Sequence, residues 1–257
     1  MDLRRQARQG ITPQSAGWKY LSFKTVTLEA GQKLADETRD DETALVWLSG
    51  KAELEGMGGV GERSDVWEGK PHAVLLPAGS SYRLEAQTAC EIALISAPAN
   101  GESSARAIRP EKMSVESRGS GVTQRTIHWI LPETQPASRL ILVEVFTPAG
   151  HWSTFPPHKH DTDDAPRERA LEELYYYRFK RREGFAFQAI YTRDRSLDVS
   201  LRTHHDDLVL VPRGYHVVSA APGYDCYYLN AMAGPVREWL FTTDPDHAWL
   251  MDWKKPS

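Results

Sequence analysis

The residues of this chain that could do chemistry begin with two histidines, His158 and His160, which stand directly after Pro156 and Pro157. Consecutive prolines disfavour a helix and favour an extended backbone at this point. On an extended strand, side chains two positions apart point to the same face. The two imidazoles can therefore converge on one ligand, although ordinary surface histidines would show the same spacing.

A carboxylate and a third histidine extend this pair into a ligand set. Glu172 and Glu173 open a strand-like run that ends in three tyrosines, and His216 follows the turn 212–214, which reads Pro-Arg-Gly. Three imidazoles with one carboxylate are a usual set of ligands for a divalent transition metal, with coordination positions left for a substrate. We therefore expect one divalent ion, zinc, manganese or iron, held by His158, His160, Glu173 and His216.

Strand parity favours Glu173 over Glu172 as the carboxylate ligand. If Glu173 faces inward, Tyr175 and Tyr177 face inward as well, and Glu172 faces outward. Both tyrosines could then hydrogen-bond substrate hydroxyls, or simply fill the wall of a barrel. Lys159, between the two histidines, should point away from the ion.

The order of these residues resembles the two cupin motifs. The first motif has His-x-His, then a glutamate, then a glycine, and is matched by His158, His160, Glu172 or Glu173, and Gly184. The second has Pro-x-Gly and then a histidine, and is matched by Pro212, Gly214 and His216. Two departures are visible: residues 161–169 form a polar insertion before the glutamate, and a single residue separates Gly214 from His216.

Composition narrows the class of protein. The chain has 257 residues, a formal net charge of −4 and 40% hydrophobic residues. The sequence lacks the excess of basic residues that nucleic-acid binding would require. No run approaches the roughly 18 apolar residues of a membrane span. The positively charged N-terminal segment is not followed by the apolar segment of a signal peptide. Two cysteines fit a reducing compartment and read as buried apolar residues. We expect a cytoplasmic protein without nucleic-acid or membrane partners, and the sequence leaves open whether it forms a homo-oligomer.

Short apolar or alternating runs separated by Gly, Pro, Asp and Ser predict an all-β fold, a sandwich or barrel. The predicted strands are Leu21–Leu28, Ala44–Leu48, Ala73–Leu76, Ile92–Ile95, Leu140–Phe146, Leu174–Phe179, Phe185–Tyr191, Leu208–Val211 and Tyr227–Asn230.

Weak internal repetition suggests two tandem copies of one barrel. Residues 28–31, Leu-Glu-Ala-Gly, are echoed at 147–150, and residues 75–79, Leu-Leu-Pro-Ala-Gly, are echoed at 210–214. We predict domains at 1–110 and 111–257, joined by an exposed connector within residues 98–120. Ser80, Ser81 and Tyr82 follow the first Pro-x-Gly, so we expect no metal in the first copy. Chance recurrence of Pro-x-Gly turns is the alternative.

The second half carries a closer resemblance. The strings PPHKHD, LEELYYYRF, GFAFQAIYT, DDLVLVPRGYH, APGYDCYYLNAMAGPVREW and DPDHAW are together similar to the 5-deoxy-glucuronate isomerases of bacterial myo-inositol catabolism. The run from Glu173 to Tyr177 is also similar to the corresponding run in the related 4-deoxy-threo-hexosulose-uronate ketol-isomerases. The resemblance implies a bicupin, two tandem double-stranded β-helix (jelly-roll) barrels. It also implies an aldose–ketose isomerase that converts 5-deoxy-D-glucuronate to 2-deoxy-5-keto-D-gluconate.

The chemistry of such an isomerase defines what the site must contain. An aldose–ketose shift passes through an enediolate, whose negative charge a divalent ion can stabilise while another group moves the carbon-bound proton. No pattern in the sequence identifies that general base. The substrate is a small deoxy-uronate, and candidates for contacts with it are Tyr175, Tyr177, Gln188, Asn230 and, through the resemblance, Arg237 for the carboxylate.

Two other function classes stay open from the sequence. Three histidines and one glutamate also suit another metal-dependent cupin enzyme, such as a dioxygenase or a related uronate isomerase, and fold does not determine function. A requirement for oxygen would distinguish a dioxygenase from an isomerase. The third class is a sugar-binding cupin without catalysis, which would retain metal and turn over no uronate.

Overall fold

Short runs of β-branched, aromatic and aliphatic residues form the strands of this chain, as their composition favours. The computed structural model describes residues 2–101 and 103–252. All nine predicted runs are confirmed as strands, with bounds that differ by a few residues: β2 (Ser22–Leu28), β4 (Asp41–Ser49), β7 (Ala73–Leu76), β9 (Cys90–Pro98), β13 (Ile141–Thr147), β15 (Glu172–Phe179), β16 (Phe185–Tyr191), β18 (Asp207–Val211) and β20 (Cys226–Ala233).

Twelve further strands were not among the predicted runs. They are β1 (Arg4–Gln6), β3 (Lys33–Glu37), β5 (Ala52–Leu54), β6 (Gly58–Val60), β8 (Ser81–Ala86), β10 (Arg106–Ile108), β11 (Ser114–Arg118), β12 (Arg125–Leu131), β14 (Trp152–Lys159), β17 (Asp198–His204), β19 (Tyr215–Ala220) and β21 (Thr242–Thr243). Several are short or mostly exposed, so they lack an apolar run. Helical turns are few: η1 (Ala7–Gln9), α1 (Pro13–Ala16), η2 (Pro110–Lys112), η3 (Gly121–Thr123) and η4 (Pro245–Asp252).

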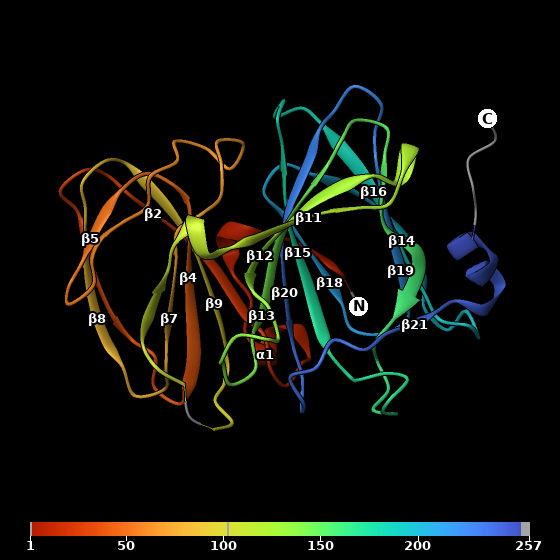
Figure 1. Ribbon diagram of the computed structural model, residues 1–257, viewed down its shortest axis with the longest axis horizontal. Helices are drawn as coiled ribbons and strands as arrows, with labels where there is room; N and C mark the ends of the chain where they lie inside the picture. The colour runs from red at the N-terminus through yellow and green to blue at the C-terminus, as the bar shows by residue number, and fades with distance from the viewer. Residues whose placement is uncertain (1, 102, 253–257) are drawn as a thin grey trace.

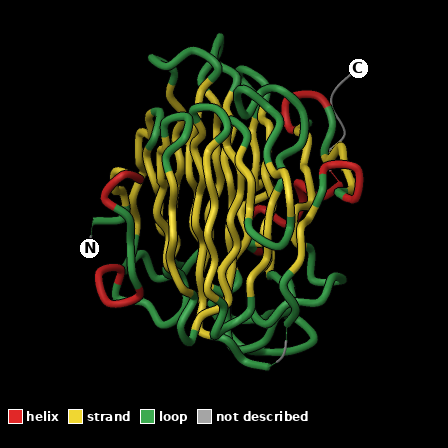
Figure 2. The backbone as a smooth tube through the Cα atoms, turned by 90° about the vertical axis from the view of Figure 1, so that its left-hand side faces the viewer, coloured by secondary structure: helices red, strands yellow, loops and turns green. Residues whose placement is uncertain are grey.

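The strands form four antiparallel sheets in two facing pairs, which appear as two lobes in Figure 1. In the first lobe, the five-stranded sheet β10-β7-β4-β9-β2 faces the four-stranded sheet β3-β8-β5-β6 across a shared apolar cluster. In the second, the seven-stranded sheet β1-β18-β15-β20-β13-β12-β11 faces the five-stranded sheet β17-β16-β19-β14-β21 across another cluster. Viewed from the side of the first lobe, the axes of the strands are nearly aligned, and the loops gather at the two ends of the strands (Figure 2).

The largest apolar cluster lies between the two lobes. It joins residues of β4, β7 and β9 to residues of β15, β18 and β20, including Val46 and Leu75 on one side and Leu174, Tyr176 and Leu229 on the other. The five-stranded sheet of the first lobe therefore packs back to back on the seven-stranded sheet of the second. This burial on both faces explains why β4, β15 and β20 read as continuous apolar runs rather than alternating ones.

Carboxylates of both lobes also tie the lobes together. Glu172 accepts hydrogen bonds from the backbone N–H groups of residues 19–21, at 2.7, 3.0 and 3.0 Å. Glu42 accepts three from residues 138–140, at 2.6, 2.9 and 3.0 Å. Arg63 of the first lobe donates to both oxygens of Glu144 at 3.1 and 3.0 Å, and both side chains are buried.

The predicted connector is not simply an exposed linker. Within residues 98–120, β10 pairs with β7 and β11 pairs with β12, and Ile108 and Met113 are buried. These strands are three and five residues long and largely polar, so no apolar periodicity reveals them. The N-terminal strand β1 pairs with β18 in the second lobe, so residues 4–6 depart from the predicted division at residue 110.

Both cysteines, Cys90 and Cys226, are buried and free, as expected from their number and setting. Among residues 2–101 and 103–252, no helix has the length and apolar character needed to cross a membrane.

Replacing Glu144 with glutamine should destabilise the protein strongly. The change leaves the Arg63 guanidinium buried between the lobes without its countercharge, which costs about 3–5 kcal/mol of unfolding free energy. Urea denaturation measures the difference. The exposed pair Arg39–Glu37 serves as control, because Glu37→Gln should cost less than about 1 kcal/mol. Equal effects of the two changes would contradict a stabilising role for the buried pair.

Candidate metal centre

Two facing sheets of the second lobe position the four predicted ligands. His158 lies on β14 and pairs with His216 of the adjacent strand β19, and His160 follows the end of β14. Glu173 lies on β15 in the opposite sheet. The structure brings all four together: the three histidines offer nitrogens within 4.8 Å of one another, and Glu173 Oε2 lies 3.0 Å from His160 Nε2 and 2.8 Å from His216 Nε2.

Backbone carbonyls orient the three imidazoles in the same sense. The Nδ1 atoms of His158, His160 and His216 lie 3.2, 3.1 and 3.3 Å from the carbonyl oxygens of residues 156, 171 and 214. A proton on each Nδ1 satisfies that carbonyl and leaves Nε2 as a lone pair, which in His160 and His216 faces Glu173. Glu173 is oriented in turn by Asn230, whose Nδ2 donates to Oε1 at 2.6 Å.

This donor set fits a cation. With Nδ1 protonated, the Nε2 lone pairs and the carboxylate oxygen are all acceptors, and acceptors at about 3 Å repel unless a positive charge lies among them. His216 Nε2 is buried and has no hydrogen-bond partner among the described residues. Three imidazole nitrogens and one carboxylate suit zinc, manganese or iron. His158, His160, Glu173 and His216 could therefore hold one divalent ion.

Burial and the neighbouring charges shift the pKa values of this cluster in different directions. Burial and the two neighbouring imidazoles lower the pKa of His158 to about 3, so its ring is neutral. Burial alone would raise the pKa of Glu173, but His216 and His160 outweigh it and hold that pKa well below its usual range. Burial works against protonation of His160 as well, yet Glu173 raises its pKa above the ordinary value.

The two consecutive glutamates of β15 point in opposite directions. Glu173 faces the histidines, whereas Glu172 reaches the other lobe through its three backbone hydrogen bonds. Lys159 also points away from the histidines, as parity predicts. Its Nζ lies 2.6 Å from Asp161 and 2.8 Å from Glu168, so it fastens the polar insertion 161–169 to the strand.

A cavity opens beside the four residues. Its inner part is lined by His158 and Glu173 and by the side chains of Arg118, Arg125, Thr154, Tyr175, Tyr228, Asn230 and Trp239. Arg118, Arg125, His158 and Trp239 also line an outer cavity of about 400 Å³. Phe155, Phe241, Leu250 and Met251 form part of its wall. Two of the predicted ligands, His158 and Glu173, thus border the inner part, which has a volume of only about 40 Å³. His158 also borders the outer cavity, which is large enough for a small molecule.

The predicted substrate contacts separate into three groups. Tyr175 lines the inner cavity, with its ring centroid 6.0 Å from that of His216. Asn230 also lines it, but its amide is engaged with Glu173. Tyr177 and Gln188 are buried deeper in the sandwich, where the tyrosine hydroxyl donates to the amide oxygen at 2.8 Å, and neither side chain lines the cavity.

The expectation for Arg237 needs correction. Its guanidinium donates to backbone carbonyls of residues 132, 133, 135 and 140 at 2.6, 2.9, 2.7 and 2.8 Å, and it lines neither part of the cavity. It therefore fastens the loop between β12 and β13 instead of facing a substrate. Those carbonyls are about a hundred residues away along the chain, so no local pattern could reveal them.

The cavity residues that sequence reasoning missed include Arg118, Arg125, Thr154, Tyr228 and Trp239. Tyr228 could have been found, because it stands two positions before Asn230 on β20 and so shares its face. Thr154 has a positive φ of 57°, uncommon for a β-branched residue. Its Oγ1 lies 3.5 Å from the hydroxyl of Tyr175 and 3.4 Å from that of Tyr228. Arg125 belongs to no motif, and no sequence signal marks it.

Comparison with known proteins places this site in a family. The model of the KduI/IolB family matches residues 2–250. The chain belongs to the KduI/IolB family. Among curated relatives in this family, the 5-deoxy-glucuronate isomerase of Geobacillus kaustophilus is 50% identical over 249 residues, which cover 95% of this chain and 90% of that protein.

Solved structures agree with the KduI/IolB assignment. An IolB-like protein from Salmonella typhimurium is 41% identical and superposes with a TM-score of 0.94, covering 98% of this chain and 100% of that one. A mutant of Bacillus subtilis oxalate decarboxylase superposes with a TM-score of 0.66 at 12% identity, covering 94% of this chain and 79% of that one. That second likeness shows a shared fold.

Glu172 and Glu173, each replaced by glutamine in a separate variant, should differ in their effect on metal binding, because only Glu173 faces the metal site. Glu173→Gln removes the charge that faces the three histidines and should lower metal retention at least tenfold, within the range for loss of a ligand or its support. Glu172→Gln should retain metal near the wild-type level. Metal analysis after dialysis measures both. The reverse pattern would mean that the register of β15 is off by one residue.

Metal affinity should fall as the pH falls. Binding needs neutral imidazoles, so protons compete with the ion. Because Glu173 raises the pKa of His160, this competition should begin above the ordinary histidine value of about 6.5. Titration of metal into the protein at several pH values between about 5 and 8 measures the effect. Constant affinity over that range would contradict a site built on His160.

Proposed function

We propose that this chain is a metal-dependent isomerase that converts 5-deoxy-D-glucuronate to 2-deoxy-5-keto-D-gluconate in myo-inositol catabolism. Relatives that carry this name and match 94–95% of this chain support the substrate and the reaction class. The observation that carries the proposal is the convergence of three histidine nitrogens and the Glu173 carboxylate, with His158 and Glu173 bordering a cavity.

We further propose the architecture that the resemblance implies, two tandem cupin barrels with the division near residue 110 and the ion in the second barrel. Two facing pairs of sheets, each around its own apolar cluster, support this proposal. In the described part of the first lobe, no group of three or more His, Cys, Asp or Glu side chains is placed to hold an ion. The first barrel would then serve packing, since its sheet covers the back of the sheet that carries Glu173.

The chain's own residues can support an aldose–ketose shift in definite ways. When bound, a divalent ion supplies a Lewis acid for the negative charge that develops on the substrate oxygens. Asn230 holds Glu173 in place through its 2.6 Å hydrogen bond. Burial raises the pKa of Tyr228 to about 12 and raises that of Tyr175 well above its usual range. Both phenols are therefore protonated at neutral pH and can donate hydrogen bonds to substrate oxygens.

The wall of the inner cavity limits which groups could move the carbon-bound proton. Apart from His158 and Glu173, its ionisable side chains are Arg118, Arg125, Tyr175 and Tyr228. No further carboxylate or lysine lines this part of the described chain. Proton transfer would therefore involve a tyrosine hydroxyl or a residue of the ligand set, in contrast to isomerases that use a separate glutamate base.

Replacing His216 or His158 with alanine should abolish isomerisation of 5-deoxy-glucuronate, because each change removes one of the converging nitrogens. The apolar clusters do not depend on an ion, so circular dichroism and melting temperature should change only modestly. His72→Ala in the first lobe is the control and should keep wild-type activity.

Chelated wild-type protein should be inactive, and added divalent metal should restore turnover without oxygen. A metal-free variant that isomerises at the wild-type rate would refute the proposal, and an oxygen requirement would favour a dioxygenase.

A further inference from the structure

One buried arginine in the cavity lacks a carboxylate partner. Arg125, at the start of β12, is only 7% exposed. Among its five N–H donors, one bonds a protein acceptor in the described chain, through Nη1 to the carbonyl oxygen of Thr123 at 3.0 Å. No carboxylate of the described residues lies within 4.0 Å of it. A buried guanidinium in this state is costly unless a further partner is supplied.

Two other arginines with little exposed surface are paired. Arg63 is buried and bonded to both oxygens of Glu144, and Arg178, which is partly buried, forms ion pairs with Glu91 and with Asp206. These pairs span or border the contact between the lobes, where the charge has a structural use. Arg125 departs from this rule, and it is also the one of the three that lines the cavity.

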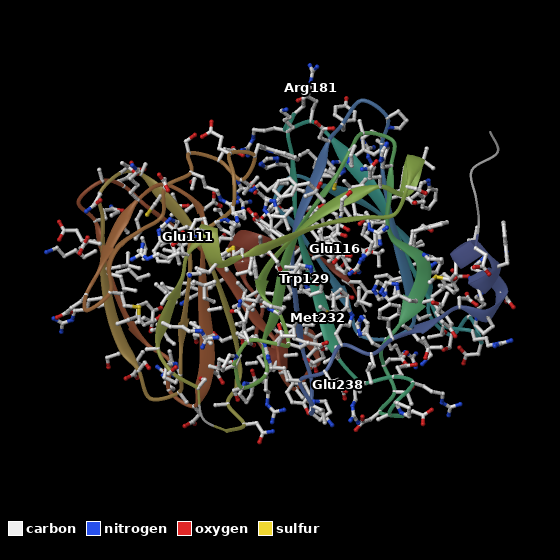
Figure 3. All side chains as sticks on the ribbon, viewed as in Figure 1. Glu111, Glu116, Trp129, Arg181, Met232 and Glu238 are labelled. Carbon is white, nitrogen blue, oxygen red and sulfur yellow. The ribbon has the colours of Figure 1, made fainter. Side chains whose placement is uncertain are left out.

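The carboxylate closest in the fold to Arg125 is already engaged. Glu116 lies on β11, the strand next to β12 at the edge of the sheet, and it accepts from Arg118 at 2.7 and 2.9 Å. The Oε2 atom of Glu116 also accepts a hydrogen bond from the indole N–H of Trp129 at 3.1 Å. Glu116 and Trp129 are labelled in Figure 3. Glu116 is thus engaged by Arg118 and Trp129 and forms no ion pair with Arg125, whose guanidinium keeps free N–H groups.

Arg125 and two of the candidate metal ligands, His158 and Glu173, line one cavity from different strands. In the sheet order β12-β13-β20-β15, Arg125 stands on the first strand and Glu173 on the last, with Tyr228 on β20 between them. A molecule that reaches from the guanidinium to the histidines would therefore need polar groups at both of its ends. A uronate has this form, because its carboxylate and its carbonyl carbon are at opposite ends of the chain.

We propose that Arg125 binds the carboxylate of the sugar-acid substrate and so selects uronates over neutral aldoses at this site. This inference rests on the proposed function for its substrate class. A guanidinium offers two parallel N–H donors that match the two oxygens of a carboxylate. Bound in this way, the acid end supplies the missing partner of Arg125 and directs the opposite end of the sugar towards His158 and Glu173.

The test compares Arg125→Met with Arg125→Lys in the metal-loaded protein. Methionine keeps an apolar stem without charge, and lysine keeps the charge without the bidentate fork. For 5-deoxy-glucuronate, Arg125→Met should raise KM about 10- to 100-fold with a much smaller change in kcat, and Arg125→Lys should lie between it and wild type. For the neutral analogue with a hydroxymethyl group in place of the carboxylate, the variants and wild type should have the same KM. Arg202→Met, on the exposed part of β17, is the control and should match wild type.

A binding measurement and a stability measurement separate this role from a structural one. The reduced substrate, which keeps the carboxylate and lacks the carbonyl, should bind Arg125→Met about 10- to 100-fold more weakly than wild type in calorimetric titration. Metal content and melting temperature should be unchanged, because the variant removes an unpaired charge. Unchanged binding of the acid, or equal loss for the acid and the neutral analogue, would overturn the proposal.

The same experiments distinguish failure of this inference from failure of the proposed function. If wild type isomerises 5-deoxy-glucuronate and Arg125→Met leaves KM and binding unchanged, the anchor is refuted and the function stands. If wild type binds the reduced acid through Arg125 but does not isomerise the aldehyde, the function is refuted and the anchor stands.

Discussion

Burial of β15 on both faces is the constraint on which the rest of the structure depends. Its outward side chains pack against the first lobe, and two of its inward ones, Glu173 and Tyr175, line the cavity of the second. Because side chains alternate along a strand, Glu172 and Glu173 serve opposite faces, one holding backbone N–H groups of residues 19–21 and the other facing three histidines. A slip of one residue would exchange these carboxylates and leave both in the wrong environment. Packing of the lobes and geometry of the candidate metal centre are therefore set by the same register.

The centre also requires the two sheets of the second lobe to close on each other. The histidines come from β14 and β19 or directly after β14, whereas Glu173 and Asn230 come from β15 and β20 in the facing sheet. Backbone carbonyl oxygens lie near the Nδ1 atoms of all three histidines and orient their rings. The side-chain amide of Asn230 donates to Glu173 and orients the carboxylate in the same way. Such support is what a metal site needs in order to be held before the substrate arrives. The fold alone does not specify the chemistry, since an oxalate decarboxylase shares it at 12% identity.

Charge is treated differently in the two settings of this molecule. Between the lobes, buried charge is neutralised within the chain, by Arg63 with Glu144 and by Arg178 with Glu91 and Asp206. In the cavity, the clustered acceptors of the four predicted ligands and the unpaired Arg125 leave charge of both signs for something outside the chain to satisfy. An ion at one place and an acid group at the other would complete the site. This difference between interface and cavity is the physical basis for both proposals.

The sequence by itself determined the features that depend on neighbours along the chain. Strand parity, the spacing of His158 and His160 and the Pro-x-Gly turn before His216 follow from the two-residue period of a strand and from local turn chemistry. For the same reason, the nine apolar runs predicted as strands are strands, and the glutamates face as parity requires.

Only the tertiary structure decided features that join residues far apart in sequence. Examples are the pairing of β1 with β18, the strands hidden in the polar connector 98–120, and the use of Arg237 on loop carbonyls about a hundred residues away. Arg125 is the clearest case, because the residues around it come from strands that are far apart in the sequence. No local pattern distinguishes it from the exposed arginines. Whether a charged side chain is neutralised, exposed or left facing a cavity depends on which distant groups the fold brings within about 4 Å, and that is a property of packing and not of composition.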